Sequence, residues 1–356
     1  MSEPNKTEDR KLQHVQICST RDVCSRYNYW DDIHLVHSAA PEVDFGSLET
    51  ETHIFGKKFS APIIIAAMTG GFDVGEKINA NLAKAASKMQ IGMGVGSQRA
   101  AIEKPSLAKT FAVVRDYDIP LRIANIGAPQ IVRAGGYRQA ADILTQAISM
   151  IDADLVAIHL NYLQEAVMIE GEKDAKGLLP LIKDLAVDFP IIIKETGAGL
   201  SPSVLQSLSK TKIKGVDVGG VGGTSFSAVE YYRAQEVGDT MPARLGKAFW
   251  NWGIPSPVTA AIASLYFPTI ATGGVRDGLD VARAIAIDAA CAGMANKLLV
   301  PALEGAEAVA DELKAIVEEL KVAMFLTGSS DIKELAALNP LVIGPTKEWL
   351  DHLTAE

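Results

Sequence analysis

The chain has 356 residues, of which 48% are hydrophobic and 22% charged, and its net charge at pH 7 is −9. This length and composition suit one large α/β barrel or two smaller domains. The acidic balance argues against broad nucleic-acid binding, which needs a basic surface, although a local cluster of Arg and Lys can still bind a small anion. The three cysteines, Cys18, Cys24 and Cys291, cannot all pair, and their spacing fits no zinc site.

The first 14 residues, MSEPNKTEDRKLQH, are polar and lack the apolar core of a secretion signal. No apolar run approaches the ~20 residues that are needed to span a bilayer. We therefore expect a cytoplasmic protein with reduced thiols and no membrane association.

From residue 60 onward, short apolar runs alternate with longer amphipathic segments. Continuous apolar runs are typical of parallel strands that are covered by helices. The expected strands are 61–67, 91–95, 121–125, 154–159, 190–194, 215–218, 269–272 and 289–294, and the expected helices include 76–89, 139–151, 202–209, 277–287 and 304–325. Eight such strands, with no GxGxxG turn after an early one, predict an α/β protein with a closed (β/α)8 TIM barrel.

We expect one domain over 1–356, in which the barrel occupies residues 61–324. Residues 1–60 would form an N-terminal extension, and 325–356 a C-terminal helical cap. The gap at 223–267, between the sixth and seventh strands, predicts an insertion that forms a lid or wall of the active site.

Polar or glycine-rich residues follow every expected strand. In a barrel these positions share the C-terminal rim, where active sites of this fold lie. The clusters are MTGG (68–71), GSQR (96–99), NIG (125–127), HLN (159–161), KE (194–195), GGVGGTS (219–225), GGVR (273–276) and MAN (294–296). One such loop is often only a tight turn, but a cluster after each of eight strands predicts a shared site.

The glycine clusters after the sixth and seventh strands predict a phosphate site. Glycines let backbone N–H groups approach a phosphate, and the start of the following helix is electropositive. Arg276 would add a fixed charge, and Thr224 and Ser225 would add hydroxyl donors. These features indicate the phosphate of a cofactor or of a substrate without deciding between them.

Lys194 ends a very apolar strand, PIIIK, so it must find a partner or lose its proton. Three roles stay open: a Schiff base, an ion pair with a buried carboxylate, or a donor to an electron-rich cofactor such as reduced flavin. His159, Asn161, Gln164 and Glu165 form a tight polar group. A lone carboxylate among amides suits a Mg²⁺ site that substrate phosphates complete, although an exposed helix start would look the same.

In their order and spacing, these motifs resemble the type 2 isopentenyl-diphosphate isomerases across nearly the whole chain. The segments RKLQH (10–14), KETGAG (194–199), WGIP (252–255) and ATGGVR (271–276) also carry the resemblance. It implies reduced FMN, NAD(P)H as reductant, Mg²⁺, and interconversion of isopentenyl and dimethylallyl diphosphate without net redox change. It also implies a homotetramer or octamer.

The resemblance further implies roles for individual residues. FMN would contact Ala67, Met68, Thr69, Ser97, Asn125, Lys194, Gly219 and Thr224, with its phosphate end on Gly274, Val275, Arg276, Ala295 and Asn296. The substrate would contact Arg10, Lys11, His14, Ser97, Gln98, Arg99, His159, Asn161 and Gln164, and Glu165 would ligate Mg²⁺. Relatives often carry Ser where this chain has Gly219, so one hydroxyl is lost there while the backbone N–H would still serve.

Moving the double bond means adding a proton at one carbon and removing another two carbons away. The expected tertiary carbocation needs a dry pocket and an electron-rich surface. We expect flavin N5 to act as general acid and base, with Gln164 and Glu165 as a relay and Lys194 favouring the flavin anion. His159 would face the substrate, and the arm with Arg10 and Lys11 would close over the diphosphate.

The nearest alternative is an FMN-dependent 2-hydroxy-acid oxidase, which needs a His base in the loop after the sixth strand. That loop, DVGGVGGTS at 217–225, contains no His. A second alternative is a flavin-free barrel with Lys194 as a Schiff base, and a third is a non-catalytic binding barrel.

Overall fold

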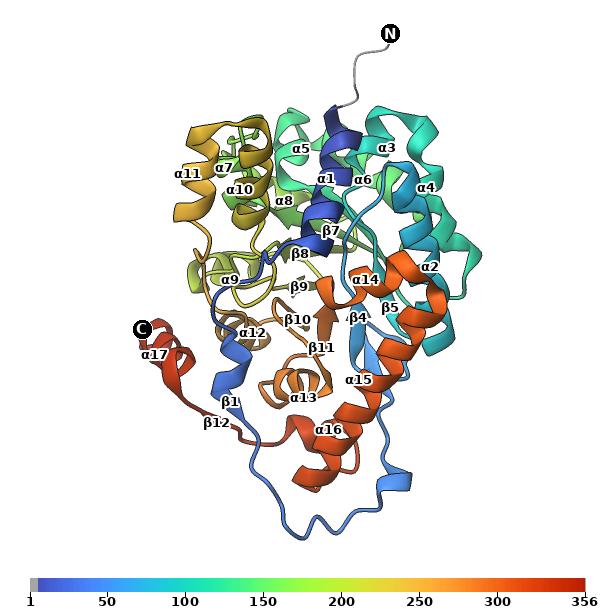
Figure 1. The fold of residues 1–356 in the computed structure, drawn as a ribbon, viewed down its shortest axis with the longest axis vertical. Helices are drawn as coiled ribbons and strands as arrows, with labels where there is room; N and C mark the ends of the chain where they lie inside the picture. The colour runs from blue at the N-terminus through green and yellow to red at the C-terminus, as the bar shows by residue number, and fades with distance from the viewer. Residues whose placement is uncertain (1–5, 356) are drawn as a thin grey trace.

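A closed barrel of eight parallel strands forms the centre of the protein, in the order β10-β11-β4-β5-β6-β7-β8-β9 (Figure 1). The computed structural model describes residues 6–355, so the first five residues of the polar leader lie outside the described residues. The strands are β4 (Ile63–Ile65), β5 (Gly92–Gly94), β6 (Arg122–Gly127), β7 (Leu155–Leu160), β8 (Ile191–Glu195), β9 (Gly215–Asp217), β10 (Thr269–Thr272) and β11 (Cys291–Met294). All eight expected strands are confirmed, and their ends move by no more than two residues.

The apolar character of these runs explains why they lie at the centre. The three isoleucines of β4 and the three that open β8 are each at most 1% exposed. A strand that is buried on both faces has no need of polar alternation, which is the pattern that identified it in the sequence. β-branched side chains also pack well on a pleated surface.

Helices surround the barrel and connect its strands. They are α2 (Asp73–Met89), α3 (Arg99–Glu103), α4 (Lys109–Ala112), α5 (Ala128–Arg133), α6 (Tyr137–Ile151), α7 (Tyr162–Val167), α8 (Leu178–Leu185), α9 (Pro202–Leu208), α12 (Ser256–Ser264), α13 (Gly278–Ala286), α14 (Asn296–Glu304) and α15 (Ala306–Thr327). The helix expected at 304–325 begins later, because Gly305 has an extended backbone and separates α14 from α15. Among residues 6–355, no helix is both long and apolar enough to cross a membrane.

The segment before the barrel contributes structure at both ends of it. Helix α1 (Lys6–Thr20) lies in front of the barrel in Figure 1, with α10 to one side and α4 to the other. The hairpin of β2 (Thr52–Ile54) and β3 (Lys57–Phe59) reaches the opposite end. There Phe55 and Phe59 pack against Gly215 and Gly92, the first residues of β9 and β5.

The chain's C-terminal part returns to this N-terminal segment. β1 (Ile33–His34) pairs antiparallel with β12 (Leu341–Val342), which lies between α16 (Ile332–Ala336) and α17 (Gly344–Thr354). The region 325–356 was expected to be helical, and it is so apart from its connecting loops and the short strand β12. The segment 223–267 contains α10 (Phe226–Val237), α11 (Thr240–Ala248) and α12, of which α10 packs against α1 and α7.

Gly278 lets α13 and α15 approach each other closely, and its substitution tests that packing. A Cβ at this position would lie 2.1 Å from the Ile316 carbonyl oxygen and 2.3 Å from the Leu320 nitrogen. We expect Gly278→Ala to lower the free energy of unfolding by about 2 kcal/mol or more, because the two helices must move apart. Chemical denaturation measures this loss.

Gly305→Ala is the matched control, because a Cβ there would meet nothing within 4 Å. It should change stability by less than about 1 kcal/mol, the scale of a helix N-cap effect. Equal losses in the two variants would contradict the close approach.

Candidate functional site

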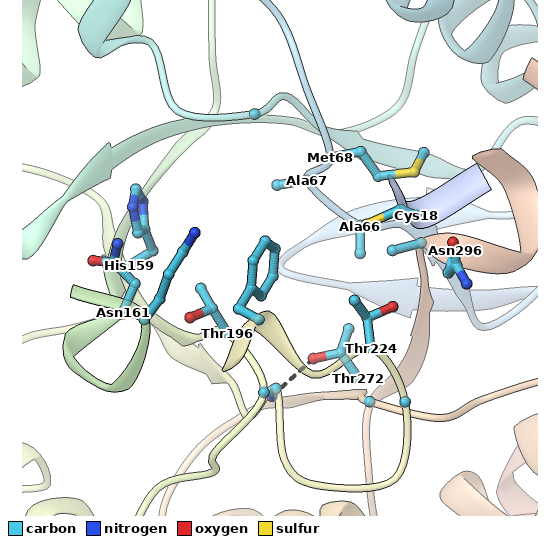
Figure 2. Close-up of a pocket in the computed structure, with 18 of the residues that line it drawn as sticks. Cys18, Ala66, Ala67, Met68, His159, Asn161, Thr196, Thr224, Thr272 and Asn296 are labelled. Atoms are coloured by element: carbon cyan, nitrogen blue, oxygen red, sulfur yellow. Dashed lines mark hydrogen bonds between the residues drawn. The ribbon is translucent and has the colours of Figure 1, made fainter. Parts of the chain in front are cut away.

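A cavity of about 600 Å³ opens at the C-terminal ends of the barrel strands. This volume is in the range of pockets that bind cofactors and small substrates. Figure 2 shows His159 and Asn161 on one side of the cavity, Ala66 and Met68 on the other, and Thr224 below. Loops after all eight strands therefore contribute to one space, as the polar clusters in the sequence predicted.

The structure brings nearly all of the sequence-predicted site residues to this cavity. Those that line it are Arg10, Lys11, His14, Ala67, Met68, Thr69, Ser97, Arg99, Asn125, His159, Asn161, Gln164, Glu165, Lys194, Gly219, Thr224, Gly274, Val275, Arg276, Ala295 and Asn296. Cys18, Asn28 and Met168 also line it and were not anticipated.

Two of the predicted residues do not line the cavity: Ser225, which is described below, and Gln98. Its side chain is fully buried and lies behind the cavity wall. The amide nitrogen donates to the Ala147 carbonyl at 2.9 Å, and the amide oxygen accepts from the Asn125 N–H at 2.9 Å. Gln98 thus joins β6 to α6, and the prediction that it contacts the diphosphate is corrected because both of its polar ends are already bonded inside the protein.

Lys194 forms an ion pair with the buried carboxylate of Asp217, at 2.8 Å. Of the three roles that the sequence left open, the structure therefore shows the pairing with a carboxylate. A Schiff base would require the Lys194 amine to be free for a substrate carbonyl, whereas its Nζ is already engaged by this carboxylate. Asp217 also accepts from the Thr272 hydroxyl, which in turn accepts from the Gly219 N–H at 2.9 Å (Figure 2).

Gly219 lies where two loops meet, and this explains its residue type. A Cβ there would lie 2.1 Å from the Glu195 carbonyl oxygen, and the φ of Gly219 is +44°. A serine would clash with this backbone, so the glycine at this position has a steric reason in this chain. The Gly219 N–H was expected to contact FMN, but it donates a hydrogen bond to the Thr272 hydroxyl instead.

His159 is held as a neutral imidazole with a defined tautomer. Asn125 Nδ2 donates to the Val95 carbonyl at 3.1 Å, so its Oδ1 accepts from His159 Nδ1 at 2.7 Å. Nδ1 therefore carries the proton, which leaves Nε2 as an acceptor. Burial lowers the pKa of His159 to about 3, and the charges of Lys194 and Lys11 act in the same direction.

Glu165 is buried beside amide groups at the start of α7. Its Oε1 accepts from Asn161 Nδ2 at 2.8 Å, and its Oε2 accepts from the Glu172 N–H at 2.7 Å. Asn161 Oδ1 is buried with no hydrogen-bond partner among the described residues. Within residues 6–355 no group of three or more His, Cys, Asp or Glu could hold a metal, so a cation here would depend on Glu165 and on ligand oxygens.

Glu230, in α10, is a site residue that the sequence reasoning missed. It is 3% exposed and contacts Gln164 Nε2 at 2.8 Å, His14 Nε2 at 3.1 Å and Arg233. Burial acts to raise the pKa of Glu230, but the hydrogen bond from His14 and the nearby charges lower it to about 2. No local motif marks this residue, because its partners lie 66 and 216 positions away in the chain.

Helix α1 closes one side of the cavity through Lys11. The Lys11 ammonium donates to the carbonyl oxygens of Gly70 at 2.6 Å and Ser97 at 2.8 Å. Burial lowers the pKa of Lys11 to about 7, and the charge of Arg10 adds to this effect. The arm therefore lies over the barrel of its own chain, which places the side chains of Arg10 and Lys11 at the cavity wall.

The two glycine loops after β9 and β10 lie against each other. A Cβ at Gly223 would lie 2.4 Å from the Gly274 nitrogen, so only glycine leaves the approach to that N–H open. Ser225, expected as a donor, instead caps α10 through the Ala228 N–H at 3.2 Å. The Arg276 guanidinium is bonded to Asp31 at 3.1 Å and Asp280 at 2.8 Å, so its charge is paired with two carboxylates.

A closed barrel of eight parallel strands, with a cavity at its C-terminal rim that glycine loops and buried ionisable side chains line, defines a TIM barrel of the kind that carries enzyme active sites. A family model described as FMN-dependent dehydrogenase matches residues 256–340, which include β10 and β11. The chain is 44% identical to an isopentenyl-diphosphate delta-isomerase of Picrophilus torridus, over 97% of this chain and 99% of that protein. It is 46% identical to the one of Archaeoglobus fulgidus, with the same coverage. The chain belongs to the isopentenyl-diphosphate delta-isomerase family.

Solved structures with a similar fold include two oxidases. A mandelate oxidase with benzoyl-formic acid is 14% identical, with a TM-score of 0.58 over 94% of each chain. A lactate oxidase of Pediococcus acidilactici is 16% identical, with a TM-score of 0.61 over 95% of this chain and 87% of that one. At such low identity these likenesses show the fold alone.

The tautomer of His159 gives a test of the site geometry. We expect ¹⁵N NMR of labelled protein to show His159 neutral, with the proton on Nδ1, at pH 5 and above. The pKa of His159 in the folded protein, about 3, lies below the ordinary value of 6.5. As the pH falls, His159 therefore takes up its second proton in the unfolded chain before it does so in the folded protein. Stability present above about pH 6.5 is therefore lost as the pH falls toward 3.

The Asn125→Ala variant removes the acceptor and should leave a mixture of the two tautomers. A charged His159 at pH 6 in the wild-type protein would refute this description.

Proposed function

We propose that this chain interconverts isopentenyl and dimethylallyl diphosphate, with reduced FMN and Mg²⁺ bound in the cavity. The observation that carries the proposal is that one cavity is lined by two kinds of group. The glycine loops 219–223 and 273–274, which we call the glycine cradle, are one kind, and Arg10, Lys11 and Arg99 with the buried carboxylate of Glu165 are the other. A flavin phosphate and a substrate diphosphate need separate sites of these two kinds. The family membership supports the same reaction.

The glycine cradle fits the phosphate of FMN. Gly223 and Gly274 leave a backbone N–H open to a ligand, and α14 begins beside them at Asn296. Lys194 would lie beside the flavin ring and favour negative charge on it. When bound, reduced FMN would supply an electron-rich π surface and a site of proton exchange.

The second kind of group fits a diphosphate that is neutralised by a cation. Glu165 and the unpartnered Asn161 Oδ1 offer the oxygen ligands that Mg²⁺ prefers. When bound, Mg²⁺ would neutralise part of the diphosphate charge. Arg10, Lys11 and Arg99 line the same cavity and would bind the remaining oxygens.

Proton handling would depend on the fixed orientation of Gln164. Because Gln164 Nε2 donates to Glu230, its amide oxygen is free to face the substrate carbon chain. Neutral His159 offers a second acceptor at Nε2. We assign Gln164 and Glu165 to the movement of protons at the substrate, while His159 and Asn161 orient it.

Water exclusion, the reductant and the oligomeric state complete the proposed function. Helix α1 would exclude water from the bound substrate, because a cationic intermediate survives only in a dry pocket. NAD(P)H would reduce the flavin, and we propose a cytoplasmic homotetramer or octamer on the family resemblance alone.

An anaerobic assay with FMN, NADPH, Mg²⁺ and isopentenyl diphosphate tests the proposal. We expect dimethylallyl diphosphate to form and the flavin to remain reduced, as NMR of the products and the visible spectrum would show. Omitting either FMN or Mg²⁺ should abolish turnover. A flavin that lactate or glycolate bleaches, with no allylic product, would instead identify a 2-hydroxy-acid oxidase.

Glu230→Gln tests the positioning of Gln164. We expect kcat to fall by about 100-fold, because a neutral amide can rotate and donate to Gln164 in place of accepting. KM for the diphosphate and the FMN content should change little, and Glu230→Asp should restore part of kcat.

Glu170→Gln is the matched control for this variant. It breaks another contact of Arg233, at 3.0 Å, on an exposed surface. It should retain wild-type kcat. If it lost as much activity as Glu230→Gln, the ion pair with Arg233 would be the cause.

A further inference from the structure

The segment 25–30 precedes the barrel in sequence, yet it bonds to both glycine loops of the cavity. The Ser25 N–H donates to the Gly223 carbonyl at 2.7 Å. Asn28 Nδ2 donates to the Gly274 carbonyl at 2.8 Å, and Trp30 Nε1 donates to the Gly273 carbonyl at 2.9 Å. Three successive donors of this segment therefore hold three carbonyl oxygens of the cradle.

These bonds fix the direction of the N–H groups in the loop after β10. In a trans peptide the C=O and the N–H point in opposite directions, and the chain has no cis peptide among its described residues. Trp30 is fully buried and is absent from the cavity wall, so the Gly273 carbonyl points into the protein. The Gly274 N–H consequently points the other way, toward the cavity that Gly274 lines.

Within the described part of the chain, the N–H groups of Gly274 and Val275 donate to no protein acceptor. Gly273 and Gly274 have φ values of +101° and +80°, a region that glycine enters at little cost. A peptide between two glycines flips easily, and a flip would turn a carbonyl oxygen toward a bound anion. An external anchor on the carbonyl prevents this flip.

We propose that Trp30 and Asn28 are positioning residues for the phosphate of FMN. Trp30 holds the Gly274 N–H toward the phosphate, and Asn28 fixes the peptide that follows Gly274. This inference rests on the proposed function, in which that cradle takes a flavin phosphate. It adds a cofactor role for the N-terminal extension, besides that of the α1 arm.

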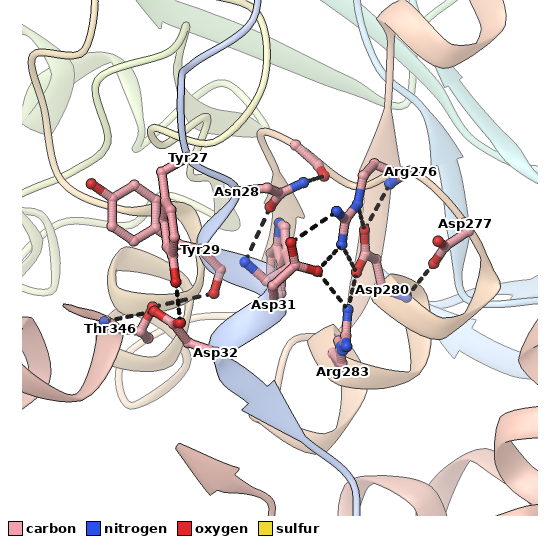
Figure 3. A network of polar contacts seen from close by, with 12 residues as sticks. Tyr27, Asn28, Tyr29, Asp31, Asp32, Arg276, Asp277, Asp280, Arg283 and Thr346 are labelled. Atoms are coloured by element: carbon pink, nitrogen blue, oxygen red, sulfur yellow. Dashed lines mark hydrogen bonds and ion pairs between the residues drawn. The ribbon is translucent and has the colours of Figure 1, made fainter. Parts of the chain in front are cut away.

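The anchoring segment is itself held rigidly at several points (Figure 3). Asp31 bonds to the Arg276 guanidinium, which Asp280 also holds. Asp32 accepts from the Thr346 N–H at 2.9 Å, at the start of α17, and from the Tyr27 hydroxyl at 2.5 Å. The charge of Arg276 thus stabilises the frame around the cradle, and backbone N–H groups are left to face the phosphate.

Riboflavin, which lacks the phosphate, allows a direct test on deflavinated protein. We expect Trp30→Phe, which keeps the ring and removes the N–H, to raise the Kd of FMN by about tenfold in fluorescence titrations. The Kd of riboflavin should stay within about twofold of the wild-type value, because the isoalloxazine contacts are unchanged. Asn28→Ala should give the same contrast, and it replaces Trp30→Phe if that variant does not fold.

Asn81→Ala is the matched control. It removes a similar hydrogen bond, from the Asn81 side-chain amide to the Ala302 carbonyl at 2.9 Å, away from the cradle. It should change neither Kd. Equal weakening of FMN and riboflavin in Trp30→Phe would overturn the inference, and so would a wild-type protein that binds the two flavins equally tightly. Because binding is the readout, a protein that shows the expected contrast but does not isomerise would contradict only the proposed function.

Discussion

Closure of the barrel between β11 and β4 is the constraint on which the site depends. Ala292, Gly293 and Met294 pair in parallel with Ile63, Ile64 and Ile65, which joins the last strand to the first. In a closed parallel sheet every strand ends at the same rim, so residues that are far apart in the chain face one cavity. Lys11 and Asn296, which lie 285 positions apart in the sequence, both line it for this reason.

The rim also holds several buried carboxylates, and each is stabilised in a different way. Asp217 has the ammonium of Lys194, Glu230 has Arg233, and Glu165 has an amide and a backbone N–H. Glu195 relies on the backbone alone, and its Oε2 accepts from the N–H groups of Thr196, Gly197, Ala198 and Gly199. Burial raises the pKa of Glu195 to about 7 against these donors. Removing a carboxylate from water costs free energy, and its partners must offset that cost. The buried carboxylates of the rim are therefore held in fixed positions by their hydrogen bonds and ion pairs.

Several residues lie in loops at the rim, as the sequence predicted, but their side chains do not make the contacts that the sequence predicted. Arg276 lies beside the cradle as expected, but its charge is engaged by Asp31 and Asp280. Gln98 sits in the GSQR cluster beside Ser97 and Arg99, yet its side chain turns into the protein. A motif fixes where the backbone passes, whereas the direction of a side chain depends on partners from other segments. Those partners are not adjacent in sequence, so no local pattern announces them.

The sequence by itself determined the strands and the rim. Apolar β-branched runs of strand length, each followed by glycine or polar residues, specify parallel strands and their loops because burial on both faces is a local property of composition. The motif order likewise indicated the family. Only the tertiary structure decided that Gln164 bonds to Glu230, that Asp217 pairs with Lys194, and that Trp30 anchors the Gly273 carbonyl. Each of these contacts joins segments that meet only when the barrel closes and the extension folds back over it, and their hydrogen bonds depend on distances that no local pattern encodes.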